Sequence, residues 1–421
     1  MAKRKKYVWK LGEPPPTIDE HSLAKLDIVE QYVGIYIDRV TRAFGQTLLN
    51  LTIVDGFCGG GLYRDGTGFV DGSPLRLLKA VEDAERELAG DRRKGFVVRA
   101  DFVFVDENPD HVAFLRDLLV RRGYLARLEK DIFLRCSTFE DAQAEVVARI
   151  HAKGPAQRAL FFLDQYGWSN VRFATLRQIL GTLAKPEILL TFAVDALIDF
   201  LSSKRSETRA LFGIDLDRED VRALEALKDE QGWRFLIQHG LYRHVQESTG
   251  ALFYTPFFIH SPKSHRSYWL IHLSNHRQAR DEMGKLHWQI QNHFMHHGGA
   301  GFGALGFDPD QDLRQGLFDF VFDDGARAQS EKAVLAQLPE LLWAERARSG
   351  DGLPMEAFFA ARCNDTAVTS EILQSQLVHL RDEKEIEIVG ANGKPKPRAT
   401  RLDWGDRILL PSQGLLFSRW R

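Results

Sequence analysis

The chain has 421 residues, a formal net charge of −2, and 44% hydrophobic and 27% charged residues. This composition is ordinary for a soluble globular protein of two or three domains, and it excludes a disordered or collagen-like chain. Its apolar runs are too short to span a membrane, and its near-neutral charge means that a basic surface for nucleic acid would have to be local. The three cysteines are widely spaced, which fits neither a disulfide framework nor a zinc cluster and indicates a reducing, cytoplasmic compartment.

The first elements are an arm, a helix and a strand. Residues 1–20 are basic and then proline-rich, which favours an N-terminal arm or lid. Apolar positions at helical spacing predict a helix over 21–48, and a short buried strand is expected at 51–55. A serine followed by proline predicts the start of a helix over 73–89.

Strands and helices alternate after this point. Strands are expected at 101–106, 125–135, 159–164 and 187–193, and helices at 109–121, 139–152 and 171–183. This alternation predicts a doubly wound parallel sheet with helices on both faces. Two later strands, near 252–260 and 267–274, are close enough in sequence to pair as an antiparallel edge.

The C-terminal part has a different pattern. Helices at 353–362 and 369–383 precede a hairpin formed by 385–389 and 400–404, and this order describes a winged helix-turn-helix. The predicted domains are an arm (1–20), an α/β domain (21–310) with a helical insertion (195–250), a linker and connecting helix (311–350), and the winged helix domain (351–421).

The strongest functional signal follows the strand at 51–55. The strand ends in Asp55 and runs into a D-x-F-x-G-x-G loop that contains Phe57, Gly59 and Gly61. Glycines let the backbone turn sharply and approach a ligand closely. A carboxylate at the strand end suits a positively charged amino group, such as that of the methionine part of S-adenosylmethionine. A glycine turn without a ligand is the alternative.

Polar residues end the next two strands as well. Asp106 is placed to accept hydrogen bonds from ribose hydroxyls, as acidic residues do in nucleotide-binding doubly wound folds. A solvated strand-end acid is the alternative. Ser137 could cap the following helix or meet an adenine amino group, and we favour the cap.

The fourth strand ends in the sequence Asp164-Gln165-Tyr166. Aminomethyltransferases carry (D/N/S)-P-P-(Y/F/W) at this point, where acceptors hold an exocyclic amine and the aromatic ring stacks on a flipped base. Asp164 and Tyr166 are therefore the candidate catalytic residues. Because Gln165 replaces a proline, a segment that only closes the cofactor pocket is the alternative.

The predicted wing carries four cations, namely Lys394, Lys396, Arg398 and Arg401. They indicate contacts with nucleic-acid phosphates, whereas the preceding helix is poor in arginine, so we expect little base readout. A winged helix that binds a protein is the alternative. No metal site is predicted, because no set of metal ligands occurs at matched spacing.

Two of these motifs together resemble a known family. The segment Asp55-Gly-Phe-Cys-Gly-Gly-Gly-Leu-Tyr63, followed by Gly72-Ser73-Pro74-Leu75, is similar to the three-Cys-motif partner proteins (TcmP). Segments 164–167, 192–196 and 274–276 and the winged helix also resemble later blocks of that family, so the resemblance covers roughly 20–420. Cys58 and Gln165 stand where a small residue and a proline are usual.

The resemblance implies a Rossmann-like class I methyltransferase fold with a C-terminal winged helix, S-adenosylmethionine as cofactor, and a three-Cys-motif protein as partner. We hypothesise a methyltransferase that acts on a nucleic acid, DNA or RNA, at a base amine. One alternative is a non-catalytic nucleic-acid-binding partner that keeps the fold and works with a second protein. Another is a nuclease or hydrolase, which lacks metal-ligand spacing here.

Overall fold

The computed structural model describes most of the chain, namely residues 7–42, 47–90, 96–165, 170–193, 245–261, 264–290, 294–297, 300–302, 319–346, 352–397 and 401–410. The chain divides into two compact units, which we describe separately. The first unit comprises 1–230 and 241–286, and the second comprises 231–240 and 287–421. Most of the predicted helical insertion, up to residue 244, lies outside the described residues.

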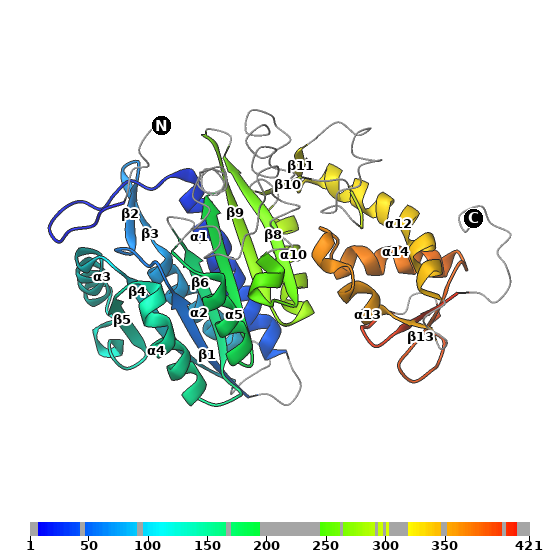
Figure 1. Ribbon diagram of the computed structural model, residues 1–421, viewed down its shortest axis with the longest axis horizontal. Helices are drawn as coiled ribbons and strands as arrows, with labels where there is room; N and C mark the ends of the chain where they lie inside the picture. The colour runs from blue at the N-terminus through cyan, green and yellow to red at the C-terminus, as the bar shows by residue number, and fades with distance from the viewer. Residues whose placement is uncertain are drawn as a thin grey trace, which may run out of the picture. The chain divides into compact units, whose positions relative to one another are not determined.

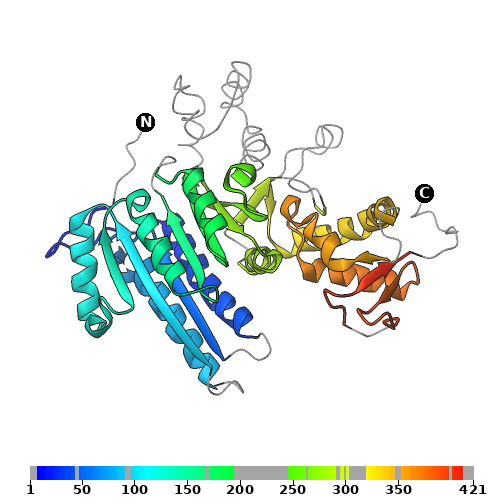
Figure 2. The ribbon, with the colours of Figure 1, turned by 60° about the horizontal axis from the view of Figure 1, so that its bottom comes forward.

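The first unit is built on one sheet, whose strands are coloured blue to light green in Figures 1 and 2. Its described strands lie in the order β8-β9-β7-β6-β1-β4-β5. Their bounds are β1 (Leu48–Asp55), β4 (Val97–Asp106), β5 (Ile132–Cys136), β6 (Arg158–Asp164), β7 (Pro186–Ala193), β8 (Phe253–Ser261) and β9 (Ser264–Ser274). The first five strands pair in parallel, and β9 is antiparallel to both β7 and β8.

This strand order confirms the predicted fold class. Taken in chain order, the five parallel strands have the spatial order 3-2-1-4-5, which is that of doubly wound folds. The antiparallel hairpin β8–β9 extends the sheet at one edge, as the sequence predicted. The first unit therefore has a class I methyltransferase-like α/β fold.

Helices cover both faces of this sheet (Figures 1 and 2). They are α1 (Glu20–Thr41), α2 (Ser73–Gly90), α3 (Pro109–Arg121), α4 (Phe139–Ala152), α5 (Phe173–Thr182) and α10 (Arg277–Gln289). Because both faces are covered, the central strands are apolar on both sides: Ile53, Phe102, Phe104 and Phe161 are fully buried. Residues 125–127, predicted as the start of a strand, instead form a short 3-10 helix that precedes β5.

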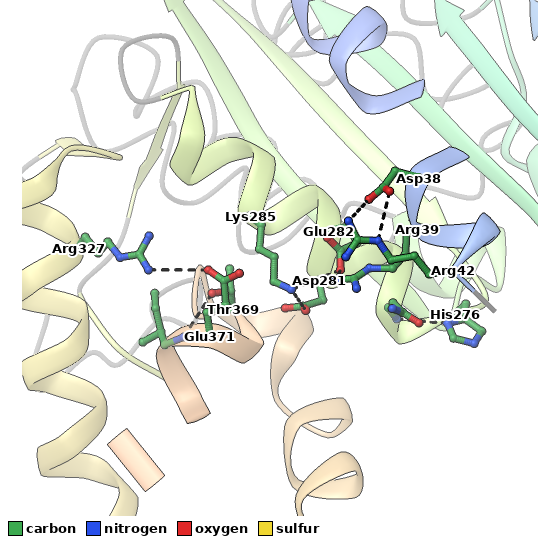
Figure 3. A network of polar contacts seen from close by, with 12 residues as sticks. Asp38, Arg39, Arg42, His276, Asp281, Glu282, Lys285, Arg327, Thr369 and Glu371 are labelled. Atoms are coloured by element: carbon green, nitrogen blue, oxygen red, sulfur yellow. Dashed lines mark hydrogen bonds and ion pairs between the residues drawn. The ribbon is translucent and has the colours of Figure 1, made fainter. Parts of the chain in front are cut away.

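Asp19 caps helix α1, because its side chain accepts a hydrogen bond from the Ser22 backbone N–H (2.7 Å). At its other end, Arg39 pairs with Glu282 of α10 (Figure 3). Ion pairs also form within each helix, with Lys285 donating to Asp281 in α10 at 2.9 Å. The Arg39–Glu282 pair attaches α1 to α10 within the first unit.

A buried polar cluster attaches the middle of α1 to the sheet. The Tyr32 hydroxyl donates to the Glu187 carboxylate of β7 and lies 3.1 Å from Nε2 of His272 on β9. His272 Nε2 is in turn 3.2 Å from the same carboxylate oxygen. Burial and the neighbouring Glu187 carboxylate raise the pKa of Tyr32 well above its usual value, so the hydroxyl stays a donor.

The second unit contains the winged helix. Its described elements are β10 (Phe294–His297), β11 (Asp319–Val321), α12 (Asp324–Arg346), β12 (Leu353–Pro354), α13 (Met355–Ala360), α14 (Ser370–Asp382), β13 (Glu387–Val389) and β14 (Arg407–Leu409). Thr369 caps α14, since its side chain accepts a hydrogen bond from the Ile372 N–H, and Arg327 of α12 approaches Glu371 at 3.9 Å (Figure 3).

The predicted order of helix, helix and hairpin is confirmed, with one correction. The second strand of the hairpin is β14, not residues 400–404, and the short strand β12 adds a third member on its other side. The expected strand position was wrong because the turn is longer than its Gly and Pro residues suggested. Lys396 donates its backbone N–H to Ile388 (2.7 Å), so residues after the turn first fold back on β13.

The cluster around Tyr32 gives a stability test. Tyr32→Phe removes the hydroxyl that Glu187 and His272 share and leaves these buried groups under-satisfied, so we expect a loss of about 1–3 kcal/mol in the free energy of unfolding. Urea denaturation measures it. Tyr124→Phe is the control, because its hydroxyl makes only a partly buried 3.3 Å contact with Glu82. Equal stability of the two variants would contradict a structural role for the cluster.

Candidate functional site

A cavity of about 780 Å³ opens at the carboxyl ends of β1, β4, β5 and β6. In doubly wound folds ligands bind at this edge, beside the strand where the order of the sheet reverses. The strand-end residues Asp55, Asp106 and Asp164 all line it, together with Phe57, Gly59 and Ser137. The structure thus brings most of the predicted site residues to one cavity. Gly61 does not line it, and Tyr166 lies outside the described residues.

Asp55 is the most deeply buried of the three carboxylates. It is 2% exposed, its Oδ1 accepts the Phe57 N–H at 3.2 Å, and its Oδ2 makes no hydrogen bond to any described residue. Burial raises its pKa from 3.8 to about 7; the charges of Asp164 and Asp106 add to the rise, and the Ser73 hydroxyl and the Phe57 amide oppose it. An unsatisfied buried carboxylate oxygen in a cavity is suited to a cationic ligand group.

Asp106 is held by the protein on both oxygens. Its Oδ1 accepts the Asn108 N–H at 2.8 Å and lies 3.1 Å from Nδ1 of buried His111. Its Oδ2 accepts the Gly59 N–H at 3.0 Å. A carboxylate oxygen can accept two hydrogen bonds, so Oδ2 retains capacity for a ligand hydroxyl. Neither Asn108 nor His111 was singled out from the sequence, although an N-cap asparagine before a proline is a recognisable signal.

The glycines of the loop have a packing role that the sequence did not indicate. Gly59 (φ +57°) and Gly61 (φ +78°) adopt the left-handed conformation that favours glycine. A Cβ at Gly59 would lie 2.8 Å from the Trp9 ring, and one at Gly61 would lie 2.7 Å from Leu115. Both glycines therefore make room for other parts of the protein. Their expected role in admitting a ligand stays a prediction.

Asp164, at the end of β6, is paired with a residue that the sequence analysis missed. Lys25 of α1 donates to both of its carboxylate oxygens at 2.6 and 2.7 Å, and the Thr191 hydroxyl donates to Oδ1. Lys25 is only 8% exposed and stands seven residues before Tyr32, on the same buried face of α1. A lysine on an otherwise apolar helix face was the available signal. The next residue, Gln165, is buried, and its side-chain oxygen accepts the Val171 N–H at 3.1 Å.

The helix cap expected at Ser137 is formed by its neighbour. Thr138 caps α4, because its hydroxyl oxygen accepts the Asp141 N–H at 3.2 Å. The Ser137 hydroxyl donates to the Thr138 carbonyl at 3.0 Å and lines the cavity. The expectation that Ser137 caps α4 was wrong by one residue, while its place at the cavity agrees with the other option.

The N-terminal arm forms one wall of the same cavity. Tyr7, Trp9, Thr17 and Asp19 all line it. The Tyr7 hydroxyl donates to Asp19 at 2.6 Å, so the arm closes on the first residues before α1. The sequence indicated an arm or lid here but named none of these residues as part of the site.

The cations of the wing are not equivalent. Lys396 is only 16% exposed in its side chain and pairs with Asp403 at 2.7 Å and with buried Asp406 at 2.8 Å. Lys394 and Arg401 are exposed. Arg398 lies outside the described residues. Lys396 thus holds the base of the wing, and the sequence could not distinguish it from its neighbours.

Two kinds of site do not occur within the described parts of the chain. No three His, Cys, Asp or Glu side chains there lie close enough together to hold a metal ion. Among the helices that the structure describes, none is both long enough and apolar enough to cross a membrane.

Comparisons with known proteins found a matching family model and several similar solved structures. Residues 306–393 match the family model of the GMT-like wHTH domain. No curated protein matches the chain. Among solved structures, a protein from Legionella pneumophila is 10% identical, with 62% of this chain and 89% of that chain covered and a TM-score of 0.35. The plantazolicin methyltransferase BamL, solved with a triazolic desmethylPZN analogue and SAH, is 10% identical, with 61% and 88% covered and a TM-score of 0.27.

The strand order and the matched domain together characterise the chain. The first unit has a methyltransferase-like α/β fold, and residues 306–393 match a winged helix-turn-helix domain. The matched range begins at residue 306 and so includes α12, which the sequence analysis placed in a connecting segment.

The raised pKa of Asp55 gives a pH-dependent stability test. Its pKa is higher in the folded protein than the usual 3.8, so its contribution to stability is present below pH 4 and is lost as pH rises through about 7. Asp55→Asn should therefore be more stable than the wild type at pH 8, by up to about 4 kcal/mol, and the gain should shrink between pH 7 and 4. Denaturant titrations of both proteins across this range measure it. A difference that does not vary with pH would contradict the raised pKa.

Proposed function

We propose that this protein is an S-adenosylmethionine-dependent methyltransferase. One observation carries the proposal: Asp55 is buried at the end of the central strand, lines the cavity, and has a carboxylate oxygen without a hydrogen-bond donor among the described residues. The positively charged α-amino group of S-adenosylmethionine would supply the missing donor and offset the charge. The cavity volume lies within the range of cofactor sites.

The remaining residues of the cavity would hold the other parts of the cofactor. Asp106 would accept from the ribose hydroxyls through Oδ2, the oxygen that now accepts a single hydrogen bond. Phe57 would supply an apolar wall, and Ser137 a hydrogen-bonding hydroxyl near the base. The bound cofactor would supply an activated methyl group on a sulfonium.

Methyl transfer requires positioning and exclusion of water more than acid–base chemistry. Asp164 and Tyr166 would face the acceptor amine, with Asp164 accepting one of its N–H groups. The Lys25 ammonium, at 2.6 Å from Asp164, would hold this carboxylate in place at the cavity. The amine that gains the methyl group loses a proton, which Asp164 would accept and pass to solvent.

The substrate we propose is a base amine of DNA or RNA. The winged helix-turn-helix supports it, because such domains place a helix in the major groove and a wing on the backbone. The exposed Lys394 and Arg401 would contact phosphates. The resemblance to the TcmP family adds a three-Cys-motif protein as the proposed partner.

A second candidate is a nucleic-acid-binding partner protein without catalysis. The exposed face of α14 favours a protein contact over base readout, because it presents Glu371, Ser375, His379 and Glu383 rather than arginines. In such a protein the cavity would bind a regulatory ligand, and no methyl group would be transferred.

Cofactor binding tests the first candidate. Isothermal titration of the full chain with S-adenosylhomocysteine should give a micromolar Kd at pH 8. Asp55→Ala should weaken binding by about 10- to 100-fold, the loss of one charged hydrogen bond. Since only ionised Asp55 pairs with the amine, wild-type affinity should fall below pH 7, approaching tenfold per unit.

A matched control separates this effect from a general disturbance of the cavity. Asp164→Asn changes another carboxylate of the same cavity, one that Lys25 already partners, and should leave the Kd within about threefold. Absence of binding by the wild type at pH 8, in the presence of the partner protein, would exclude the methyltransferase.

The wing gives an independent test of nucleic-acid binding. The double variant Lys394→Gln, Arg401→Gln should lower the slope of log affinity against log salt by about two, because two phosphate contacts are lost. Lys396→Gln is the control: its ammonium is held by Asp403 and Asp406, so the slope should stay and the domain should become less stable. Fluorescence anisotropy with labelled duplexes measures both. An unchanged slope in the double variant would assign the domain to protein binding.

A further inference from the structure

The N-terminal arm is built into the cofactor loop by one side chain. Trp9 is 3% exposed, although it lies far from the sheet in sequence. Its indole N–H donates to the Leu62 carbonyl at 2.6 Å, directly after the glycine loop. Its ring meets Tyr63 edge-on, with centroids 5.2 Å apart. Because its ring is buried and its N–H is hydrogen-bonded, Trp9 attaches the arm specifically to the end of the glycine loop.

The glycine loop is shaped around this ring. A Cβ at Gly59 would lie 2.8 Å from the Trp9 ring, and a Cβ at Gly60 would lie 2.3 Å from its Cγ. Real Cβ atoms do not approach other atoms so closely, so larger residues at these positions would displace the ring. Two successive glycines are therefore matched to Trp9.

Trp9 also contacts the group that orients Asp106. The His111 ring packs edge-on against Trp9 with centroids 4.9 Å apart, and its Nδ1 lies 3.1 Å from Asp106 Oδ1. The other oxygen of Asp106 accepts the N–H of Gly59, which packs on the same ring. His111 and Gly59 thus each contact Trp9 and each bind one oxygen of Asp106, the carboxylate proposed to hold the ribose.

The rest of the arm is attached at a second place. Arg64 of β2 (Leu62–Asp65) donates its backbone N–H to Pro16 at 2.8 Å and accepts from Ile18 at 2.9 Å. Tyr7 and Asp19 bond to each other across the start of the arm, at 2.6 Å. Residues 7–19 therefore form a closed strap along one wall of the cavity.

We propose that this arm is a working part of the cofactor site and that Trp9 is its positioning residue. Trp9 holds the loop at Gly59 and, through His111, the carboxylate of Asp106 in the geometry that binds the ribose. The inference rests on the proposed function for the identity of the ligand. The coupling must also be reciprocal. If attachment of the arm raises the affinity for the cofactor, the bound cofactor must stabilise the attached arm by the same factor.

Calorimetry with S-adenosylhomocysteine tests the first half. Trp9→Ala should weaken binding by about 10- to 100-fold, whereas Trp9→Phe, which keeps an aromatic ring against Gly60, should recover most of the affinity. Gly60→Ala keeps Trp9 but pushes its ring away, and should weaken binding like Trp9→Ala. If Trp9→Ala fails to fold, Gly60→Ala and the proteolysis below decide the question.

Limited trypsin digestion of the wild type tests the second half. Trypsin can cleave after exposed Lys10 only when the arm, with Trp9, has detached from the glycine loop. A saturating concentration of S-adenosylhomocysteine should therefore slow this cleavage. The factor should equal the loss of affinity caused by Trp9→Ala. Cleavage after exposed Lys384, in the second unit, is the internal control and should not change.

The outcomes separate this inference from the proposed function. No binding by the wild type would overturn the proposed function and this inference with it. Normal binding by Trp9→Ala and Gly60→Ala, with cleavage after Lys10 unaffected by ligand, would overturn the inference alone. Weaker binding by both variants, recovery by Trp9→Phe and ligand protection at Lys10 would support it.

Discussion

Three neighbouring parallel strands each end in an aspartate, and the first unit is arranged around the resulting concentration of negative charge. Parallel strands place Asp55, Asp106 and Asp164 at one edge of the sheet, where three negative charges line one cavity. Burial makes the charge of Asp55 the most costly of the three, whereas Asp164 is half exposed. The three are stabilised differently. Lys25 pairs with Asp164, and backbone N–H groups and His111 hold Asp106. Asp55 has the Phe57 amide and the Ser73 hydroxyl on its side, and no cation. Burial, with a smaller contribution from the neighbouring carboxylates, raises the pKa of Asp55, and its unsatisfied oxygen is suited to a cationic ligand group.

The compensating groups come largely from the part of the chain that precedes the sheet. Lys25 stands on α1, and Trp9 on the arm before it. The cluster of Tyr32, Glu187 and His272 fixes α1 against β7 and β9, and so fixes Lys25 two helical turns earlier on the same face. An N-terminal segment that looks like an appendage in the sequence thereby supplies both the charge balance and a wall of the cavity.

The second unit offers a different kind of surface. Its wing was expected to present four cations, but Lys396 is used internally by Asp403 and Asp406, while α14 presents acidic and neutral side chains. Among the wing cations that the structure describes, Lys394 and Arg401 are the ones left for phosphate contact, a modest electrostatic contribution for a protein of net charge −2.

The sequence alone determined the order of the strands and helices, the class of the fold, and the convergence of Asp55, Asp106 and Asp164, because periodicity and strand ends are local and parallel strands share one edge. A local signal also placed the start of α4, although the cap is Thr138 and not Ser137. Only the tertiary structure decided what surrounds these carboxylates. The pairing of Lys25 with Asp164 spans 139 residues, Trp9 reaches Leu62 across 53, and β14 lies beyond the expected hairpin strand. Such contacts depend on how elements pack in space, and no local pattern of residue types specifies which distant partner a buried charge or ring will meet.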